Sequence, residues 1–399
     1  MSVPVKAPFR AEHLGSLLRP KELLVAREEF ENGKMSEAQL DPISDKAVAE
    51  AVKMQADLGF HACTDGEYRR GMFWGTFFEE LDGFKEIDNA HVSMFRDYVP
   101  DVSVFHEMGG WGWTCICDGK IKHTGKSSLI KEWSYTRDQA AKNGREAKLT
   151  MISPVWYHLR FKEGNAYPAD VYSSDKEYFA DIAAAYRAEL DILYDAGVRN
   201  IQIDDPNFAY FCSQAMIDGW AADKDNKTTL DELLDTYIAH YNDCFSSHAD
   251  KIHFGLHICR GNFKGSRHFS EGGYDRIATL LFQKLCFHTY YLEYDTERAG
   301  GFEPLQQLPA HKRVVLGVVS SKFNTMEDKD AMVKRVREAA QHMAKGSGET
   351  PDQALQRLSV SPQCGFASHE EGNAITWDGM VDKLKLVRAI ADDIWKAEP

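Results

Sequence analysis

Two residues in the stretch FGLHICRGNF, residues 254–263, have side chains that can bind a metal ion. His257 and Cys259 stand two positions apart in an apolar run that ends at a glycine. Residues two apart on an extended strand point to the same face, so this spacing presents an imidazole nitrogen and a sulfur together. A lone His-x-Cys is equally compatible with ordinary strand packing. The pair by itself leaves both interpretations open.

Other residues with similar chemistry stand near the ends of short apolar runs. Glu293 lies in TYYLEY, and Cys364 lies in SPQCG. If these ends meet those of His257 and Cys259, one imidazole, two thiolates and one carboxylate converge. Such donors suit Zn²⁺ in tetrahedral geometry, whereas Mg²⁺ and Ca²⁺ prefer all-oxygen sites. The alternative is a hydrogen-bonded core histidine, two small core cysteines and a paired carboxylate.

Eight short apolar runs are expected to be the β-strands that position these residues. They are residues 9–16, 61–67, 147–154, 200–206, 251–259, 289–294, 313–320 and 358–365. Segments with apolar residues at three-to-four spacing lie between them, which is typical of amphipathic helices. Eight strand–helix units predict an α/β protein with a (β/α)8 TIM barrel, whose functional groups come from the C-terminal strand ends. A doubly wound sheet is the rival, but the first run lacks a Gly-rich phosphate turn.

One barrel domain is expected to span residues 1–399, with an insertion after the second strand. Residues 77–130 are rich in aromatic, β-forming and turn residues and break the strand–helix rhythm. Within them, WTCICDGKIKHTG predicts a β-hairpin that turns at Asp118-Gly119. Cys115 and Cys117 in this stretch are interpreted as strand residues, because no second pair of metal ligands follows nearby.

Composition indicates a globular protein and argues against nucleic-acid and membrane partners. Hydrophobic residues make up 43% and charged residues 27% of the 399 positions, as in ordinary globular proteins. The net charge of −14 argues against a nucleic-acid partner. No apolar run reaches the length of a membrane span, and the N-terminus lacks the apolar core of a signal peptide. The eight cysteines are therefore expected to be free thiols in the cytoplasm.

At these residues the chain resembles the cobalamin-independent methionine synthase family. More narrowly, it is similar to the single-barrel members, which correspond to the C-terminal catalytic half of the long enzymes. The matching segments are FRAEHLGSLLRP, TDGEYRRGMF, IQIDDP, HICRGN, YYLEYD and SPQCGF, which extend from near residue 8 to near residue 368. The His-x-Cys pair, the later strand-end glutamate and the final P-x-C-G form a specific combination.

The resemblance implies a (β/α)8 barrel that holds one Zn²⁺ and transfers a methyl group from a 5-methyltetrahydrofolate-type donor to the sulfur of homocysteine, forming methionine. The implied zinc ligands are His257, Cys259, Glu293 and Cys364. The implied contacts to the thiol substrate are Ser16, Glu67 and Asp204. Zinc coordination ionises a thiol, and the thiolate is the nucleophile. We expect the substrate sulfur to displace or loosen the oxygen of Glu293.

The donor half of the site departs from the family pattern. The third run continues as ISPVWYHLRF in place of the Gly-Pro-Val-Thr pattern of the long enzymes, and no second barrel for a polyglutamylated folate is present. Trp156 is the candidate donor-side residue, although an aromatic there also fits a core or gate position.

Three other functions therefore remain open beside methyl transfer from a folate. The first is a zinc-dependent thiol alkyltransferase that uses an epoxide or a methylcorrinoid as the electrophile. The second is a hydrolase barrel with Asp204, Asp205 or Glu67 as paired carboxylates. The third is a non-enzymatic binding barrel with a structural zinc.

Overall fold

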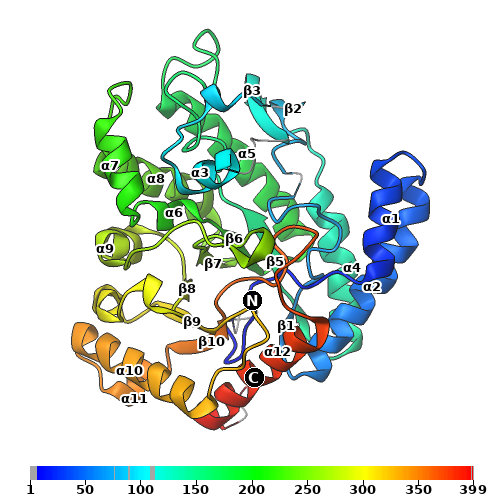
Figure 1. The fold of residues 1–399 in the computed structure, drawn as a ribbon, viewed down its shortest axis with the longest axis vertical. Helices are drawn as coiled ribbons and strands as arrows, with labels where there is room; N and C mark the ends of the chain where they lie inside the picture. Colours follow the sequence, from blue (N-terminus) through cyan, green and yellow to red (C-terminus); the bar gives the residue numbers. More distant parts are fainter. Residues whose placement is uncertain (1–6, 76, 89, 108–112, 397, 399) are drawn as a thin grey trace.

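A six-stranded parallel sheet forms the centre of the molecule (Figure 1). The computed structural model describes residues 7–75, 77–88, 90–107, 113–396 and 398. The sheet has the order β10-β9-β8-β7-β6-β5. Its strands are β5 (Leu149–Ile152), β6 (Asn200–Asp204), β7 (His253–Ile258), β8 (Thr289–Glu293), β9 (Arg313–Val319) and β10 (Leu358–Pro362). Each strand lies one position away from the next in chain order, as strand–helix–strand units require.

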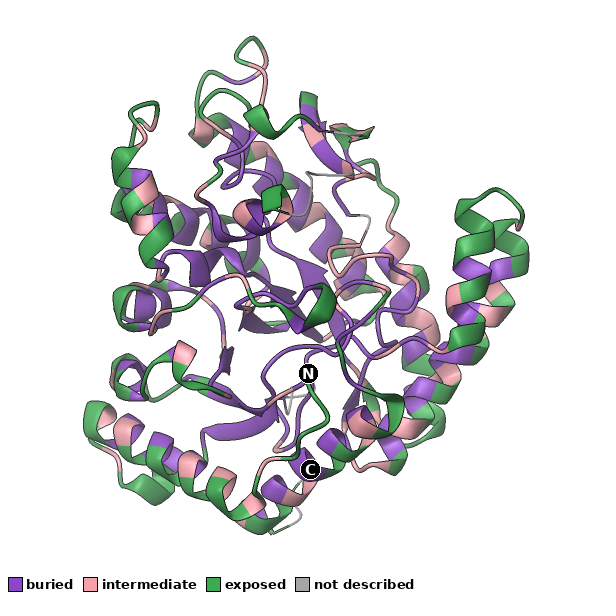
Figure 2. Ribbon diagram, viewed as in Figure 1, coloured by how far each residue is buried: buried purple, intermediate pink, exposed green. Residues whose placement is uncertain are grey.

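Helices cover the outer face of this sheet (Figures 1 and 2). The α-helices are α1 (Lys21–Glu31), α2 (Glu37–Asp57), α3 (Pro100–Glu107), α4 (Ser128–Lys142), α5 (Asp175–Asp195), α6 (Asn207–Tyr210), α7 (Gln214–Ala222), α8 (Leu230–Phe245), α9 (Asp275–Lys284), α10 (Lys329–Ser347), α11 (Pro351–Leu355) and α12 (Trp377–Trp395). Short 3-10 turns are η1 (Val92–Met94), η2 (Ser246–His248), η3 (Lys264–Ser266), η4 (Glu297–Ala299) and η5 (Glu303–Gln307). No helix of the described residues is long and apolar enough to cross a membrane.

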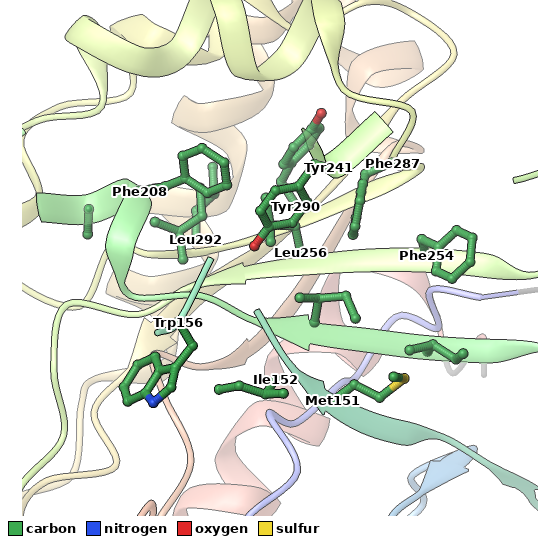
Figure 3. Packing of buried hydrophobic residues seen from close by; sticks show 14 of the residues in the cluster. Met151, Ile152, Trp156, Phe208, Tyr241, Phe254, Leu256, Phe287, Tyr290 and Leu292 are labelled. Carbon is green, nitrogen blue, oxygen red and sulfur yellow. The ribbon is translucent and has the colours of Figure 1, made fainter. Parts of the chain in front are cut away.

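The helices begin where polar side chains satisfy their first backbone N–H groups. Thr229 caps α8, and the Glu232 side chain accepts a hydrogen bond from the Thr229 backbone in return, which forms a capping box. The inner faces of the helices pack on the outer face of the strands. The side chains on the other face of the strands are buried as well, so the strand sequences are continuous apolar runs. Figure 3 shows this packing, in which Phe254 and Leu256 of β7 lie among aromatic and aliphatic side chains such as Phe287 and Leu292.

Additional pairings extend the sheet at both edges. At one edge, β1 (Ala62–Cys63) pairs in parallel with β4 (Glu146–Ala147), which directly precedes β5. At the other edge, Ala11 forms a parallel bridge with Val360 of β10. Residues 9–16, predicted as the first strand, form this single bridge and otherwise run as an extended segment. The same segment reaches the β1 side, because the Thr64 hydroxyl donates a hydrogen bond to the Gly15 carbonyl at 2.7 Å.

The predicted hairpin at Asp118-Gly119 is wrong. Trp113–Lys122 is one strand, β3, and it pairs antiparallel with β2 (Asp82–Asp88) instead of with itself. The register shifts between Asp82 and Phe84, so the Asp118-Gly119 pair lies in a bulge. Gly83 makes this possible, since a Cβ there would meet the Lys120 carbonyl oxygen at 2.5 Å. Residues 89 and 108–112 of the predicted insertion, 77–130, lie outside the described residues.

Candidate metal centre and pocket

Four side chains from three strands of the sheet, β7, β8 and β10, or from the residues just after them, meet at the C-terminal ends of the strands. His257 lies on β7, Cys259 directly follows it, Glu293 ends β8, and Cys364 follows β10. One ligand atom from each residue lies within 4.8 Å of every other. The two sulfur atoms are 3.4 Å apart. Among the described residues, this is the group of His, Cys, Asp and Glu side chains whose geometry can hold a metal ion, and Cys115 and Cys117 are not part of it.

The backbone of β8 fixes the His257 ring. Nδ1 lies 3.3 Å from the Tyr291 carbonyl oxygen, so a proton on Nδ1 donates to that oxygen and Nε2 is the nitrogen that can bind a metal. Nε2 is buried and has no hydrogen-bond partner among the described residues. Metal-binding histidines commonly show this arrangement, with one nitrogen oriented by a carbonyl and the other left for the metal.

Glu293 is fully buried and is held through both carboxylate oxygens. Oε1 accepts a hydrogen bond from the Arg260 backbone N–H at 2.8 Å. Oε2 accepts one from the Arg298 guanidinium at 3.0 Å, and the same guanidinium nitrogen lies 2.8 Å from Asp295. These hydrogen bonds therefore hold the Glu293 carboxylate in position even when neither of its oxygens binds a metal.

The thiols and the imidazole shift each other's pKa. The hydrogen bond with Cys259, and then the neighbouring imidazole of His257, lowers the pKa of Cys364 to about 5, although burial opposes this shift. Burial acts against charge on His257, but the neighbouring Cys364 and the acidic groups raise the pKa of the imidazole to about 9, so the ring must lose a proton when it binds a metal. The donor set of two sulfurs, one nitrogen and one carboxylate matches the preferences of Zn²⁺.

The candidate metal centre borders a pocket. Three of the four donor residues, His257, Cys259 and Cys364, line this pocket. The other residues predicted from the sequence to contact substrates also line it, namely Ser16, Glu67, Trp156 and Asp204. The structure therefore places every residue of the predicted site at a single pocket. Glu293 does not line this pocket but contacts the group of donor residues that does.

Two buried carboxylates face this pocket. Glu67 has a φ of 60°, which is rare for a residue other than glycine and holds its side chain inward. Its Oε1 accepts a hydrogen bond from Thr150 at 3.0 Å, while Oε2 has no partner among the described residues. Burial, together with the charges of Asp204 and Asp65, raises the pKa of Glu67 to about 8 against the influence of Arg70. A cationic group entering the pocket would relieve this accumulation of negative charge.

Asp204 ends β6 and lies on the same side of the sheet as His257. Gln202 donates a hydrogen bond to its Oδ1 at 2.9 Å. Burial raises the pKa of Asp204 to about 6, although His257 and Gln202 act in the opposite direction. The neighbouring Asp205 does not line the pocket; it accepts hydrogen bonds from Ser153, Tyr241 and the Asn207 backbone.

Ser16 is packed tightly against the loop that carries Cys364. A Cβ at Gly365 would lie 1.9 Å from the Ser16 Oγ, so this position excludes any larger residue. The Ser16 Oγ accepts a hydrogen bond from the Ala367 backbone at 3.4 Å, and its carbonyl accepts one from Phe366 at 3.0 Å. The Ser16 hydroxyl proton is therefore available to a ligand in the pocket.

Trp156 belongs to an aromatic cluster at the pocket wall. The Arg160 guanidinium carbon lies 3.6 Å from the centroid of its ring. Phe73 and Trp74 contact the same indole, with ring centroids at 5.1 and 5.2 Å. Because Arg160 covers part of the indole surface, a ligand would meet Trp156 as part of a composite wall with Phe73 and Trp74.

Sequence reasoning missed several residues of the site. Phe73, Trp74, Asp101 and Phe105 line the pocket, and Arg298 holds Glu293. None of them lies on a predicted barrel strand, so neither periodicity nor strand-end position singles them out. The stretch DTERAG, immediately after β8, did carry a cation close to a predicted ligand, and this was the one available indication of Arg298.

The fold and the site define an α/β protein with a candidate metal centre at the C-terminal ends of parallel strands. A family model described as the cobalamin-independent synthase, catalytic domain, matches residues 167–392. The chain therefore belongs to this family of methionine synthase-like methyltransferases.

Similar proteins cover nearly the whole chain. Two Bacillus subtilis (strain 168) proteins, YxjG and YxjH, both described as uncharacterized, are 34% and 32% identical over 98% of this chain and 96% of their own length. A 5-methyltetrahydropteroyltriglutamate–homocysteine methyltransferase of Bacillus thuringiensis is 23% identical over 82% of this chain, and the match spans 37% of that longer protein.

Solved structures show the same fold. A Listeria monocytogenes protein described as a candidate vitamin-B12-independent methionine synthase superposes with a TM-score of 0.71 at 27% identity, over 98% of both chains. A B12-independent methionine synthase of Shewanella sp. W3-18-1, in complex with selenomethionine, superposes with a TM-score of 0.65 at 20% identity, again over 98% of both chains.

Proposed function

We propose that this protein is a zinc-dependent thiol methyltransferase that transfers a methyl group from a 5-methyltetrahydrofolate-type donor to the sulfur of homocysteine. One observation carries the proposal: donor atoms of His257, Cys259, Glu293 and Cys364 lie within 4.8 Å of one another beside a pocket with two buried carboxylates. Zinc held there would supply Lewis acidity that lowers the pKa of the substrate thiol and keeps its sulfur nucleophilic.

The pocket residues suit an amino-acid thiol. Asp204 and the free Oε2 of Glu67 are acceptors for an ammonium group. The hydroxyl of Ser16 can donate to a carboxylate at the other end of the substrate. These contacts would fix the sulfur toward the metal centre, and the aromatic wall would exclude water from the transfer.

We further propose that the sheet closes into a single (β/α)8 barrel that includes residues 77–130 as an insertion. Residues 9–16 contact both edges of the sheet, and these contacts support its closure. The Glu12 backbone N–H donates to Val360 of β10 at 2.9 Å, and the Glu12 side chain pairs with buried Lys148, between β4 and β5, at 2.8 Å. Because Cys259 and Cys364 must remain thiols, the proposal places the enzyme in a reducing compartment such as the cytoplasm.

A second candidate keeps the same thiol chemistry and changes the electrophile to an epoxide or a methylcorrinoid. The departure of the donor half from the family pattern, with ISPVWYHLRF after the third strand, motivates this candidate. The hydrolase interpretation has less support, because Asp205 is occupied by other hydrogen bonds and does not line the pocket.

The test combines metal analysis with product analysis. The purified protein is expected to contain about one zinc ion per chain and to form methionine from homocysteine and 5-methyltetrahydrofolate, detected by mass. Parallel reactions with methylcobalamin and a small epoxide distinguish the second candidate. A protein that turns over any of these donors without bound metal would contradict both candidates.

A further inference from the structure

The insertion contributes to the wall of the pocket, and this wall carries one polar group among aromatic rings. Asp101 and Phe105 of α3 line the pocket together with Phe73, Trp74 and Trp156. The other polar lining groups belong to the metal centre, to the predicted thiol contacts or to the loops around them. Asp101 is thus a carboxylate in the apolar part of the pocket, contributed by a segment outside the barrel repeat.

Only one of the two carboxylate oxygens of Asp101 has a hydrogen-bond partner among the described residues. The residue is 1% exposed, and its Oδ2 receives a hydrogen bond from the Arg160 Nε at 2.5 Å. Its Oδ1 is buried and has no hydrogen-bond partner among the described residues. A buried acceptor without a partner is unfavourable, so a site that retains one is expected to satisfy it with a ligand.

Arg160 fixes this carboxylate relative to the aromatic wall. Its Nη1 donates to the Trp156 carbonyl at 2.8 Å and to the Asn207 side chain at 3.1 Å. Its guanidinium carbon stacks 3.6 Å from the Trp156 ring centroid. Asp101, Arg160 and Trp156 are therefore linked, and Arg160 fixes the carboxylate of Asp101 beside the aromatic wall.

This unit shares a pocket with the metal centre. Asp101 lines the same cavity as the donor residues His257, Cys259 and Cys364. A molecule held by Asp101 would therefore occupy the cavity into which the substrate sulfur is proposed to bind.

We propose that Asp101 determines which alkyl donor the enzyme accepts, by taking a hydrogen bond from an N–H group of a flat nitrogen heterocycle packed against Phe73, Trp74 and Trp156. This inference rests on the proposed methyl transfer to a thiol. The thiol substrate is not the partner of Asp101, because Ser16, Glu67 and Asp204 already match its polar groups. A small epoxide has no N–H group and leaves Oδ1 unsatisfied.

Asp101→Asn is the decisive variant. Arg160 requires an acceptor, so the amide oxygen keeps the Arg160 side and the NH2 group takes the place of Oδ1. The pocket then presents a donor where it presented an acceptor, with almost unchanged shape. The KM for 5-methyltetrahydrofolate should rise roughly 10- to 100-fold, the range for losing a hydrogen bond to a charged group. The KM for the thiol and the zinc content should stay at the wild-type values.

The matched control is Asp97→Asn, which changes an exposed carboxylate of the same insertion and should leave both KM values unchanged. A second measurement needs no variant. Trp74 and Trp156 line the pocket, so their fluorescence reports binding of 6-methyltetrahydropterin and of its analogue with N3 and the 2-amino group fully methylated. The wild-type protein should bind the parent pterin at least roughly tenfold more tightly.

Equal binding of the two pterins, or a wild-type donor KM in Asp101→Asn, would overturn the role of Asp101. These outcomes are distinct from failure of the proposed function, which would appear in the wild-type protein as absence of zinc or of thiol methylation. The same fluorescence measurement on Asp101→Asn, in which the preference for the parent pterin should be lost, decides on Asp101 even where no turnover is seen.

Discussion

The sulfur atoms of Cys259 and Cys364 lie 3.4 Å apart, although 105 positions separate the two residues in the chain. At this distance two thiolates would repel each other strongly, and a shared proton or a cation must lie between them. The zinc ion proposed for this site would satisfy both sulfurs as thiolates.

Replacing either sulfur should abolish metal binding. In Cys259→Ser or Cys364→Ser, a hydroxyl that remains protonated takes the place of a thiolate ligand. Zinc content should fall from about one per chain to near zero, and methyl transfer should fall by more than the roughly 10- to 100-fold typical for loss of a group that supports a ligand. Metal analysis and product formation measure the two effects.

Cys286→Ser is the matched control, because Cys286 is a free, half-buried thiol outside the metal group. It should retain zinc and activity. Full zinc occupancy in Cys259→Ser would contradict the proposed ligand set.

Arg298 should act through Glu293. Arg298→Gln removes the charged hydrogen bond to the Oε2 of Glu293 and leaves the ligand less well oriented. Affinity for zinc should fall roughly 10- to 100-fold, as for other residues that orient metal ligands. Competition with a chromophoric chelator measures this affinity directly, independently of turnover.

Arg276→Gln removes a guanidinium of the same type from a solvent-exposed pair with Asp231 and should leave zinc affinity unchanged. If Arg298→Gln binds zinc as tightly as the wild-type protein, Glu293 does not depend on this contact for its position.

Glu67 should make stability depend on pH in a defined direction. Its pKa in the folded protein is raised to about 8, first by burial, so the folded state holds this proton more tightly than the unfolded state. Stability therefore falls as pH rises from the ordinary glutamate range toward 8, and the loss is complete above the folded pKa. In Glu67→Gln this contribution disappears, so the variant should gain stability relative to wild type over the same interval.

Urea unfolding of both proteins at pH 5, 6, 7, 8 and 9 measures the difference. The gap should widen up to about pH 8 and then remain constant. Glu86→Gln, at an exposed position of β2, should show no such widening. A constant difference at all pH values would mean that Glu67 is not protonated in the folded protein near neutrality.

Asp204 should contribute to recognition of the substrate ammonium group. Asp204→Asn keeps the shape of the side chain and removes its charge, which should raise the KM for homocysteine roughly 10- to 100-fold. The KM for 4-mercaptobutyrate, which lacks the amino group, should change far less. Steady-state kinetics with both thiols measures this, and Asp218→Asn on exposed α7 is the control. Equal effects on the two thiols would assign Asp204 another role.

The buried pair of Glu12 and Lys148 should stabilise the join between the N-terminal segment and the sheet. Both side chains are fully buried, and the ammonium lies 2.8 Å from the carboxylate. Lys148→Met alone leaves a buried carboxylate without its partner and should lower the free energy of unfolding by about 3–5 kcal/mol. The double variant with Glu12→Gln should recover part of this loss, as urea unfolding would show. Equal stability of the single and double variants would contradict the coupling.

The sequence by itself determined the strand pattern and the chemistry that each strand end offers. Short apolar runs bounded by polar residues must be buried on both faces, so seven of the eight expected strands recur as paired strands and the first as a bridged segment. Because parallel strands present their C-terminal ends at one edge, His257, Cys259, Glu293 and Cys364 could be expected to converge, whereas their selection as a ligand set came from the resemblance to the family.

Only the tertiary structure decided what lies across the pocket from these strand ends. The pairing of β2 with β3 depends on the bare Cα of Gly83, and no local pattern predicts that contact. Asp101 of α3 and Arg298 of η4 enter the site from segments outside the predicted strands, and the positions of these segments depend on long-range packing and ion pairs. Periodicity describes burial along one element, whereas the position of a loop side chain depends on every element that it packs against.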